Sequence, residues 1–575
     1  MSPVTNQPIT KKGQPARGLT TAGRRTWAIV GILLALQAIL QVDCARRWTP
    51  THDEYWHLPL GLYAWKTGDL RADPINPPLP RLWAALPLVM TGVSLGEVKF
   101  PAADAYAVGD AFQRAHPHDH RELFFRGRLM IIPWGLLGGI IIAAWARTWW
   151  GNASGILATL LWCSCPLLLG HGALVSHDLP GTVATLAVLY STMRIRERPS
   201  FWGSALVGVL IGLACLTKFS ALILLPMTPM FWLILPGSSS TPRLTWQRQL
   251  CGACLALWCW WCVIQLGYLS DSLSGRPALR AWGLSYLLPI GFQAGLTALE
   301  TVLQAQHPVF LNGQWSLSGF RTYYLFAMLY QLPLGLWCCG GISAWLGWKQ
   351  HRDQQHLRRI LSLWLVIGAV LIPSSLSENQ LGFRYVMAAV PLGILFAASA
   401  AADWNRAGRW RQLTVRLAAI AALLVLRYHP HHLSYFNELA GGPEAGRYLL
   451  VDSNIDWGQD LHALRDYLKQ HPSGQPLSLA YFGTESPSTL GLKYDYPPPR
   501  NPVPGRYAVS VNLVMGRPYH LRDLNGQQYV ANIEDFGYFR FFQPTARIGY
   551  SIDVYHLRPT DVARYWAARA GLQQP

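Results

Sequence analysis

The sequence predicts a polytopic α-helical membrane protein that ends in a soluble α/β domain. Of its 575 residues, 51% are hydrophobic and only 14% are charged, a composition too apolar for an ordinary soluble enzyme. Many apolar runs approach the ~20 residues that an α-helix needs to cross a bilayer. After residue 428 the apolar runs shorten to strand length, and charged residues, Asn, Pro and Gly become frequent, so a second domain begins there.

The N-terminal region predicts a cytoplasmic tail and a membrane anchor. Residues 1–25 are polar and basic, and the first apolar run, 26–43, follows directly. Positive flanks keep such a tail on the cytoplasmic side, so residues 44–127 emerge outside. We expect this stretch to be one long external loop with helices along the interface, because its short apolar piece, 82–95, is followed by several acids and little excess of Lys and Arg.

Further apolar runs bring the predicted transmembrane domain, 26–427, to about 11 spans, with an upper bound of about 13. Basic residues at 194–198, 243 with 248, 349–359 and 406–411 then all fall on the side of the N-terminal tail, as the positive-inside rule requires. One more apolar piece, 283–303, either lies at the interface or inserts. The predicted spans are 26–43, 129–147, 153–172, 179–193, 201–217, 219–236, 250–269, 324–348, 359–375, 385–402 and 412–427.

An odd number of spans places the C-terminal domain, 428–575, outside, on the same side as the loop 44–127. Leucines line one face of its first helical run, and alternating apolar and polar residues indicate strands. The predicted elements are a helix over 456–470, strands over 477–483, 506–515 and 547–557, and a helix over 560–571.

Charge and cysteine content argue against other classes. Lys and Arg (48) outnumber Asp and Glu (30), but they form short clusters between apolar runs, which is typical of membrane topology and does not indicate nucleic-acid binding. The ten cysteines lie mostly inside apolar runs and none follows Cys339, so no disulfide framework is expected. Cys251 and Cys254 have CxxC spacing without a second pair, which favours small buried side chains over a metal site.

The stretch 48–57 places two adjacent carboxylates, Asp53 and Glu54, just outside the first predicted span. One interpretation is a solvated loop, or a helix start whose acids complement the helix dipole. The other is a reaction centre at the membrane surface, around which the isolated polar residues of the later spans are arranged.

Short motifs support the second interpretation. In chain order they are Thr51-His-Asp-Glu54, Gly68-Asp-Leu70, Asn76-Pro-Pro-Leu79, Arg128-Leu129, Ser176-His-Asp178, Leu216-Thr-Lys218 and Arg384-Tyr385. Over roughly residues 26–402, this series resembles the protein O-mannosyltransferase-like family of polyprenyl-phosphate-dependent glycosyltransferases, which includes the bacterial aminoarabinose transferases. The resemblance implies a GT-C fold, in which many membrane helices surround an external active site. Residues 432–442 and 452–460 resemble the external domain of bacterial members.

The resemblance implies transfer of a sugar from polyprenyl phosphate to an acceptor hydroxyl or phosphate of a protein, lipid or glycan, on the outer face of a bacterial inner membrane. Asp53 occupies the position of the family's proposed general base, with Glu54 beside it in the catalytic pair. A single base acting opposite the phosphate would invert the anomeric centre. No cofactor is firmly implied.

Three basic residues are candidates for holding the donor phosphate: Arg128, Lys218 and Arg384. Arg128 and Arg384 stand at the ends of apolar runs, where snorkelling to lipid headgroups is the alternative. Lys218 lies on the outer side between two tightly connected runs, where an ionisable residue is a functional hypothesis by default. Family members often have His or Lys where this sequence has Asn76, and Arg81, one turn later, is a candidate substitute.

For the sugar or acceptor, the resemblance implies Asp178, and His52, His57 and Tyr385 are further candidates. The alternatives are ordinary structural roles. Asp178 is well placed to cap the helix that follows it, and interfacial packing would explain His52 and His57 equally well. In the C-terminal domain, Trp457 could stack on a sugar ring, although core packing is the favoured interpretation.

Metal binding and other functions are weaker hypotheses. A divalent ion at Asp53 and Glu54 with the run His116-Pro-His-Asp-His120 is conceivable, but the run lacks the i, i+4 spacing of a strong zinc motif, so no metal ligands are predicted. The sequence has no HExxH, Walker or GxGxxG motif, which disfavours a sugar nucleotide handled inside the cell. A flippase for a lipid-linked sugar is the alternative function, although internal repeats typical of transporters are not evident. A structural or sensory protein, the third hypothesis, would not need Asp53.

Overall fold

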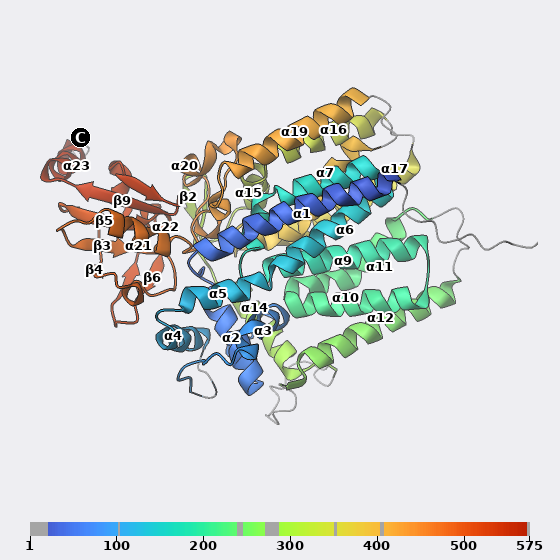
Figure 1. Ribbon diagram of the computed structural model, residues 1–575, viewed down its shortest axis with the longest axis horizontal. Coiled ribbons are helices and arrows are strands. Elements are labelled where there is room, and N and C mark those ends of the chain that lie inside the picture. The colour runs from blue at the N-terminus through green and yellow to red at the C-terminus, as the bar shows by residue number, and fades with distance from the viewer. Residues whose placement is uncertain are drawn as a thin grey trace, which may run out of the picture.

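The computed structural model describes residues 21–99, 101, 104–237, 245–270, 287–349, 353–402 and 408–571. Figure 1 shows a long bundle of helices that is followed, at one end, by a smaller part containing most of the strands. Helices α2 to α5 lie at the end of the bundle that faces this smaller part. The predicted basic tail falls almost entirely outside the described residues.

The helices up to residue 426 include those of the predicted external loop and of the predicted spans. They are α1 (Thr21–Arg47), α2 (Glu54–Thr67), α3 (Leu79–Met90), α4 (Ala105–Ala115), α5 (His120–Leu129), α6 (Ile132–Trp150), α7 (Asn152–Cys163), α8 (Pro166–His171), α9 (Asp178–Glu197), α10 (Phe201–Thr217), η1 (Phe219–Ile223), α11 (Leu224–Ile234), α12 (Trp246–Gly267), α14 (Ile290–Gln304), α15 (Tyr323–Gln331), α16 (Leu334–Lys349), α17 (Gln354–Leu376), η2 (Phe383–Ala389), α18 (Val390–Ala398), η3 (Ser399–Ala401) and α19 (Gly408–Leu426). A hairpin of β1 (Val309–Leu311) and β2 (Gln314–Ser316) interrupts them.

Five helical segments in the described part of the chain are long and apolar enough to cross a membrane alone. They are Thr21–Arg47, His120–Trp150, Trp246–Gly267, Gln354–Leu376 and Phe383–Ala401. The number rises to six if α15 and α16, which meet at 107°, form one broken span. The class of multi-pass membrane protein is therefore confirmed, whereas the predicted count of about 11 spans is not confirmed.

Two of the predicted spans are interrupted at proline. The span predicted over 324–348 is divided into α15 and α16, and the span predicted over 153–172 is divided into α7 and α8. The residues before the prolines, Leu332 and Cys165, have extended ψ angles of 140° and 114°. Proline disfavours helical backbone in the residue before it and has no N–H to donate, so neither helix continues across its proline.

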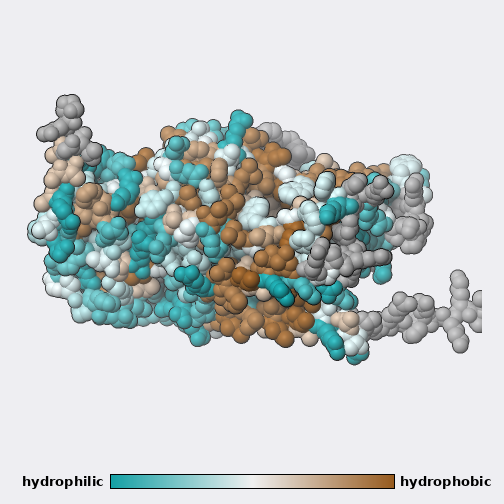
Figure 2. Space-filling view, turned by 90° about the horizontal axis from the view of Figure 1, so that it is seen from above, coloured by the Kyte–Doolittle hydropathy of each residue, from teal (hydrophilic) through white to brown (hydrophobic). Residues whose placement is uncertain are grey.

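The surface of the helical part is apolar. Figure 2 shows a broad hydrophobic region over the helices, next to a hydrophilic surface on the strand-containing part. In α12, Ile264 is the one buried residue, and large side chains such as Trp258 and Leu266 are more than half exposed. A soluble protein rarely exposes so extensive an apolar surface. This face therefore fits contact with lipid.

The C-terminal part contains a five-stranded sheet of order β4-β3-β5-β9-β8. Strand β3 runs parallel to β4 and β5, whereas β9 runs antiparallel to β5 and β8. A separate antiparallel pair, β6 and β7, adds a ribbon. The elements are η4 (His432–Ser434), η5 (Glu438–Ala440), α20 (Gly442–Gly446), η6 (Asp452–Asn454), α21 (Leu461–Gln470), β3 (Leu477–Ala480), η7 (Pro487–Leu490), β4 (Tyr494–Asp495), β5 (Gly505–Ser510), α22 (Val511–Val514), β6 (Tyr519–Arg522), β7 (Gln528–Ala531), η8 (Gly537–Phe541), β8 (Ala546–Ile548), β9 (Ile552–Leu557) and α23 (Pro559–Gly571).

The boundaries in this part differ from three predictions. The helix predicted from 456 begins at Leu461, because Gly458 in the preceding loop has φ +86°, a conformation that suits a turn. The strand predicted over 506–515 ends at Ser510 and turns into α22. The strand predicted over 547–557 is two strands, β8 and β9, joined by a turn in which Gly549 and Tyr550 both have positive φ.

Candidate active site

Glu54, the first residue of α2, is fully buried and forms two parallel hydrogen bonds with Arg128 of α5. Arg128 donates from Nη2 to Oε2 at 2.7 Å and from Nε to Oε1 at 2.9 Å. The same carboxylate accepts bonds from Thr51 N at 3.0 Å, Thr51 Oγ1 at 3.1 Å and Val175 N at 2.7 Å. Its oxygens are thus enclosed by protein donors, and this geometry favours a structural role for Glu54 over the predicted catalytic one, which stays a prediction.

Arg128 has no donor left for a phosphate. Its Nη1 group donates to the carbonyls of Ala45 and Trp48, both at 2.8 Å, and Nη2 donates to the carbonyl of Thr49 at 2.9 Å. With the two bonds to Glu54, these contacts use all of the guanidinium's N–H groups. The predicted phosphate contact of Arg128 stays a prediction, and it would require Arg128 to release one of these acceptors. Instead, Arg128 holds the end of α1 and the following loop against α5.

Asp53, immediately before α2, lies in a more open position. Its side chain is 22% exposed, whereas that of Glu54 is 0% exposed. Asp53 Oδ2 accepts a hydrogen bond from Arg384 Nη1 at 2.7 Å. No residue in the described part of the chain donates to Oδ1. One oxygen of Asp53 is thus held by a cation, and the other remains available to a substrate.

A second acid–base pair adjoins Arg384. Asp178, at the start of α9, accepts a hydrogen bond from Lys218 Nζ at 2.6 Å. Lys218 lies at the break between α10 and η1, and Gly181 on α9 allows it to approach, since a Cβ on Gly181 would lie 3.3 Å from Lys218 Cβ. Arg384 Nη1 is 3.5 Å from Asp178 Oδ2, so Arg384 joins both acids into one cluster.

Two aromatic rings flank the cations of this cluster. Tyr385 is partly exposed, and its ring centroid lies 5.2 Å from Arg384 Cζ and 5.4 Å from Lys218 Nζ. Trp457 comes from the C-terminal part, and its ring centroid lies 4.3 Å from Arg384 Cζ. These distances suit cation–π attraction. The structure thus brings Asp53, Asp178, Lys218, Arg384 and Tyr385 together.

The predicted histidines lie elsewhere. The ring of His52 packs edge-on against Trp56, Phe482 and Tyr519, with centroids 5.2 to 5.9 Å apart, and burial lowers its pKa. His57 is buried, with Nδ1 3.8 Å from Asp73 and its ring 4.5 Å from that of His177. Neither predicted substrate contact is supported, because both rings are enclosed by other side chains.

Arg81 does not replace a basic residue at Asn76. Its guanidinium is buried, with Nη1 3.3 Å from Asp73 Oδ2, and Asn76 Nδ2 donates to the same oxygen at 3.1 Å. Both side chains thus hold Asp73 inside the protein. This burial does not favour a phosphate contact for Arg81, which stays a prediction.

The run His116 to His120 does not gather around a metal position with Asp53 and Glu54. His116 contacts Asp119 at 3.2 Å and the carbonyl of Ser94 at 2.8 Å. His120 is buried and lies 3.4 Å from Glu485 of the C-terminal part. The two histidines therefore serve separate local contacts.

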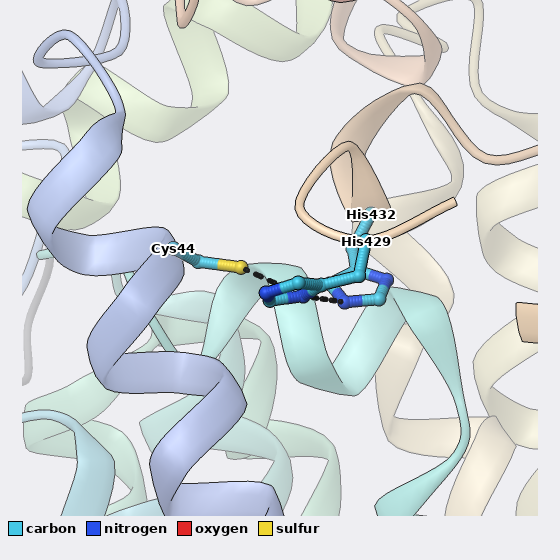
Figure 3. A group of neighbouring side chains, drawn as sticks. All are labelled: Cys44, His429 and His432. Atoms are coloured by element: carbon cyan, nitrogen blue, oxygen red, sulfur yellow. Dashed lines mark hydrogen bonds between the residues drawn. The ribbon is translucent and has the colours of Figure 1, made fainter. Parts of the chain in front are cut away.

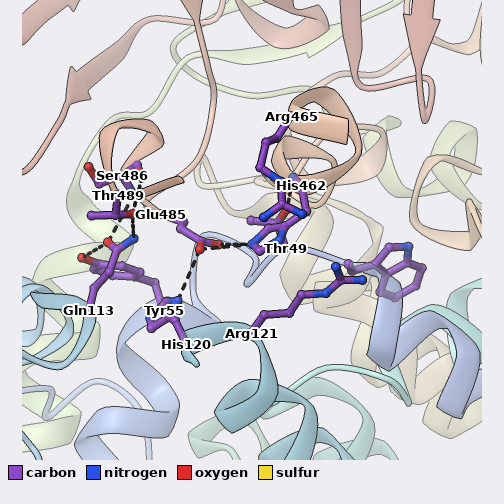
Figure 4. Close-up of polar contacts among 12 residues, drawn as sticks. Thr49, Tyr55, Gln113, His120, Arg121, His462, Arg465, Glu485, Ser486 and Thr489 are labelled. Carbon is purple, nitrogen blue, oxygen red and sulfur yellow. Dashed lines mark hydrogen bonds and ion pairs between the residues drawn. The ribbon is translucent and has the colours of Figure 1, made fainter. Parts of the chain in front are cut away.

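Glu485 joins the stretch 44–127 to the C-terminal part, as Figure 4 shows. Its carboxylate contacts both His120 and His462, the latter at 3.2 Å. Burial by itself raises the pKa of Glu485, but the neighbouring His462 and the hydrogen bonds from both rings outweigh this and hold the pKa well below its usual range. Nearby, Gln113 donates to Thr489 at 2.8 Å across the same interface.

Two further residues adjoin the cluster: His171, which the sequence does not predict, and Trp457, which the sequence offers only as a residue for sugar stacking. His171 lies with Nδ1 3.7 Å from Asp178 Oδ2, and Trp457 lies against Arg384. Trp457 is buried, which agrees with core packing more than with stacking on a sugar. His171 also lines a cavity region beside Arg384, together with Gln331 and Asn454. No spacing in the sequence relates His171 or Trp457 to Asp178 or Arg384.

Comparison with known families identifies part of the chain. Residues 122–264 match the family model described as dolichyl-phosphate-mannose-protein mannosyltransferase. This segment contains Arg128, Asp178 and Lys218. The match confirms the resemblance inferred from the motifs for this segment. It indicates a glycosyltransferase.

Individual proteins resemble this chain only distantly. No curated protein matches the sequence significantly. Among solved structures, ArnT from Cupriavidus metallidurans bound to undecaprenyl phosphate aligns with 13% identity and a TM-score of 0.47, covering 91% of this chain and 97% of that one. An Archaeoglobus fulgidus oligosaccharyltransferase in complex with Zn and sulfate aligns with 12% identity and a TM-score of 0.37, covering 87% of this chain and 73% of that one. At these scores no residue role transfers from them.

Proposed function

We propose that this protein transfers a sugar from a polyprenyl-phosphate donor to an acceptor hydroxyl or phosphate, with Asp53 as the general base. The observation that carries the proposal is the cluster in which a partly exposed carboxylate, Asp53, lies beside two cations, Arg384 and Lys218. The match of residues 122–264 to the dolichyl-phosphate-mannose-protein mannosyltransferases supports a lipid-phosphate donor. The acceptor belongs to a protein, a lipid or a glycan.

In the proposed reaction, Asp53 Oδ1 takes the proton from the acceptor oxygen. That oxygen attacks the anomeric carbon, and the bond from this carbon to the phosphate oxygen breaks, so the lipid phosphate leaves with the bonding electrons. Arg384 and Lys218 stabilise the charge that develops on the phosphate. Attack opposite the leaving group inverts the anomeric centre. Asp178 positions both cations for this role.

The two cations differ in how freely they meet a phosphate. Lys218 donates one hydrogen bond to Asp178, and an ammonium group has three donors, so it can bind a phosphate oxygen without releasing its partner. Arg384 shares Nη1 between Asp53 and Asp178. We therefore assign the main phosphate contact to Lys218 and the positioning of Asp53 to Arg384.

The proposal includes a topology. We assign the N-terminus to the cytoplasm and about 11 spans, in a GT-C arrangement, to the transmembrane domain 26–427. Asp53 then lies on the outer face of a bacterial inner membrane. The C-terminal domain, 428–575, then lies on the same side and covers the cluster through Trp457. A lipid-linked donor would reach the site laterally from the bilayer.

The test is transfer of labelled sugar from a panel of polyprenyl-phosphate sugars, using membranes that contain wild type or Asp53→Asn, with label followed into lipid, protein and glycan fractions. We expect label to move with wild type and to be lost in the variant at equal expression. If neither protein transfers label from any donor while both bind the lipid-linked sugars equally, the assignment fails and a flippase becomes the better explanation.

A further inference from the structure

A cysteine and two histidines meet where α1 ends beside the segment that follows α19. Figure 3 shows Cys44 on α1 pointing toward His429 and His432. Cys44 Sγ lies 3.9 Å from His429 Nδ1, and His429 Nδ1 lies 3.1 Å from His432 Nε2. The three ligand atoms all lie within 4.8 Å of one another. Sequence patterns do not predict this grouping, because Cys44 and the histidines are far apart in the chain.

We propose that Cys44, His429 and His432 form a Zn²⁺ site. Thiolate and imidazole are the ligands that zinc prefers, with Zn–S near ~2.3 Å and Zn–N near ~2.0 Å. In a tetrahedral site these lengths place sulfur about 3.5 Å from nitrogen and two nitrogens about 3.3 Å apart. The two contacts of His429, 3.9 Å to sulfur and 3.1 Å to nitrogen, differ from these values by a few tenths of an ångström. The fourth position would be filled by water.

The surroundings of His429 support a metal ligand. Its Nε2 lies 2.9 Å from Asp43 Oδ2, so the proton on that nitrogen is held by a carboxylate and the lone pair of Nδ1 points toward Cys44 and His432. A carboxylate on the far nitrogen is the usual partner of a metal-binding histidine, because it fixes the tautomer and raises the basicity of the ligand. Cys44 is 0% exposed and His432 is 2% exposed, so water does not compete for two of the three ligands.

The position of the site indicates a structural role. His432 begins η4, and Ser434 in the same short helix donates to the carbonyl of Ile455 at 2.6 Å and accepts from Gln459 Nε2 at 3.1 Å. A metal ion at Cys44 would therefore fasten the end of α1 to the segment that holds the loop carrying Trp457. Since Trp457 packs on Arg384, the ion would stabilise one wall of the cluster without touching a substrate. This inference is independent of the proposed function.

The experiment measures metal on the purified full-length protein, prepared with a histidine-free tag and equilibrated with Zn²⁺ against a competing chelator. We expect about one Zn²⁺ per chain, and losses of affinity in Cys44→Ser and in His432→Gln that exceed the ~10- to 100-fold typical of an outer-shell partner. Matched controls are Cys338→Ser and His431→Gln, which remove a thiol and an imidazole outside the group and should retain the ion. Asp43→Asn should weaken binding about 10- to 100-fold.

Cobalt provides a test that needs no variant. Wild type loaded with Co²⁺ should show a thiolate-to-cobalt charge-transfer band and the intense visible absorption of a tetrahedral ion. Wild type that takes up neither metal would overturn the proposal, and the two imidazoles would then share a proton. Stoichiometric metal that persists in the double variant Cys44→Ser, His432→Gln would also overturn it, as would a cobalt spectrum without the thiolate band.

Discussion

Asp53 and Glu54 are neighbours in the sequence, and each pairs with an arginine, yet the two pairs differ in almost every other respect. Glu54 and Arg128 are both 0% exposed, and protein groups use every donor of the arginine. Asp53 and Arg384 are partly exposed, and Arg384 is shared with Asp178. One pair is therefore complete within the protein, whereas the other keeps capacity for a ligand.

The comparison shows why adjacent acids at a helix start take different roles. Successive residues of a helix point about 100° apart, so when one carboxylate faces the packed loops between α1 and α5, the next faces the open cluster. A buried ion pair needs bidentate geometry and additional hydrogen bonds to offset its desolvation, and Glu54 has both. A reactive carboxylate needs the opposite arrangement, with an oxygen free to receive a proton.

The largest effect is expected from breaking the buried pair. Arg128→Met leaves the Glu54 carboxylate uncompensated in the interior, and loss of one partner of a buried pair typically costs ~3–5 kcal/mol. We expect a large fall in the thermal midpoint of the detergent-solubilised protein and in its yield. Arg126→Met is the matched control on the same helix, since Arg126 forms an exposed i, i+4 pair with Glu122 at 3.1 Å and should contribute under ~0.5 kcal/mol. Equal stability of the two variants would contradict the structural role of Arg128.

Asp53→Asn should separate activity from stability. Removing a general base typically lowers the rate ~10²- to 10⁴-fold, while Arg384 keeps Asp178 as a partner, so the thermal midpoint should change far less than in Arg128→Met. Transfer of labelled sugar and thermal unfolding are measured on the same preparation. Asp119→Asn, a solvent-exposed acid that follows α4, is the control and should leave transfer unchanged. A variant Asp53→Asn that transfers normally would show that the open pair is not the reaction centre.

Lys218 tests whether the open cluster binds phosphate. In Lys218→Met, the loss of a hydrogen bond to a charged group should raise the KM for donor lipid about 10- to 100-fold. Lys218→Arg should recover part of this loss, because it restores the cation. Steady-state kinetics with varied donor would measure both. If KM for the donor is unchanged and only the acceptor KM moves, Lys218 serves the acceptor instead.

The smallest effect concerns Glu485, a buried acid whose partners are histidines. Its folded-state pKa is held below the ordinary value of 4.5, so it contributes stability that is present above pH 4.5 and is lost as the pH falls below that value. Thermal midpoints of wild type should therefore decline below about pH 4.5, and Glu485→Gln should flatten this decline. Identical pH profiles for the two proteins would count against Glu485 as a contact that holds the stretch 44–127 to the C-terminal part.

Much of the organisation follows from local sequence patterns. Apolar runs identify the membrane class, the change in composition near residue 428 separates the strand-containing part, and the motifs single out Asp53, Asp178, Lys218 and Arg384 as members of one site. Hydrophobic patterns predict the wrong element boundaries where a proline or a tight turn interrupts a helix or strand. Proline at 166 and 333 breaks predicted spans, and the turn at Gly549 and Tyr550 divides a predicted strand.

The sequence by itself determined which charged residues border the apolar runs. It also determined that the motifs resemble those of glycosyltransferases. Both follow from composition, periodicity and short motifs, which are local properties. Only the tertiary structure decided that Glu54 and Arg128 are enclosed while Asp53 stays open. It alone placed Trp457 on Arg384 and brought Cys44 to His429. The physical reason is that burial and ion pairing depend on which helices and loops pack together, and these contacts join residues separated by hundreds of positions.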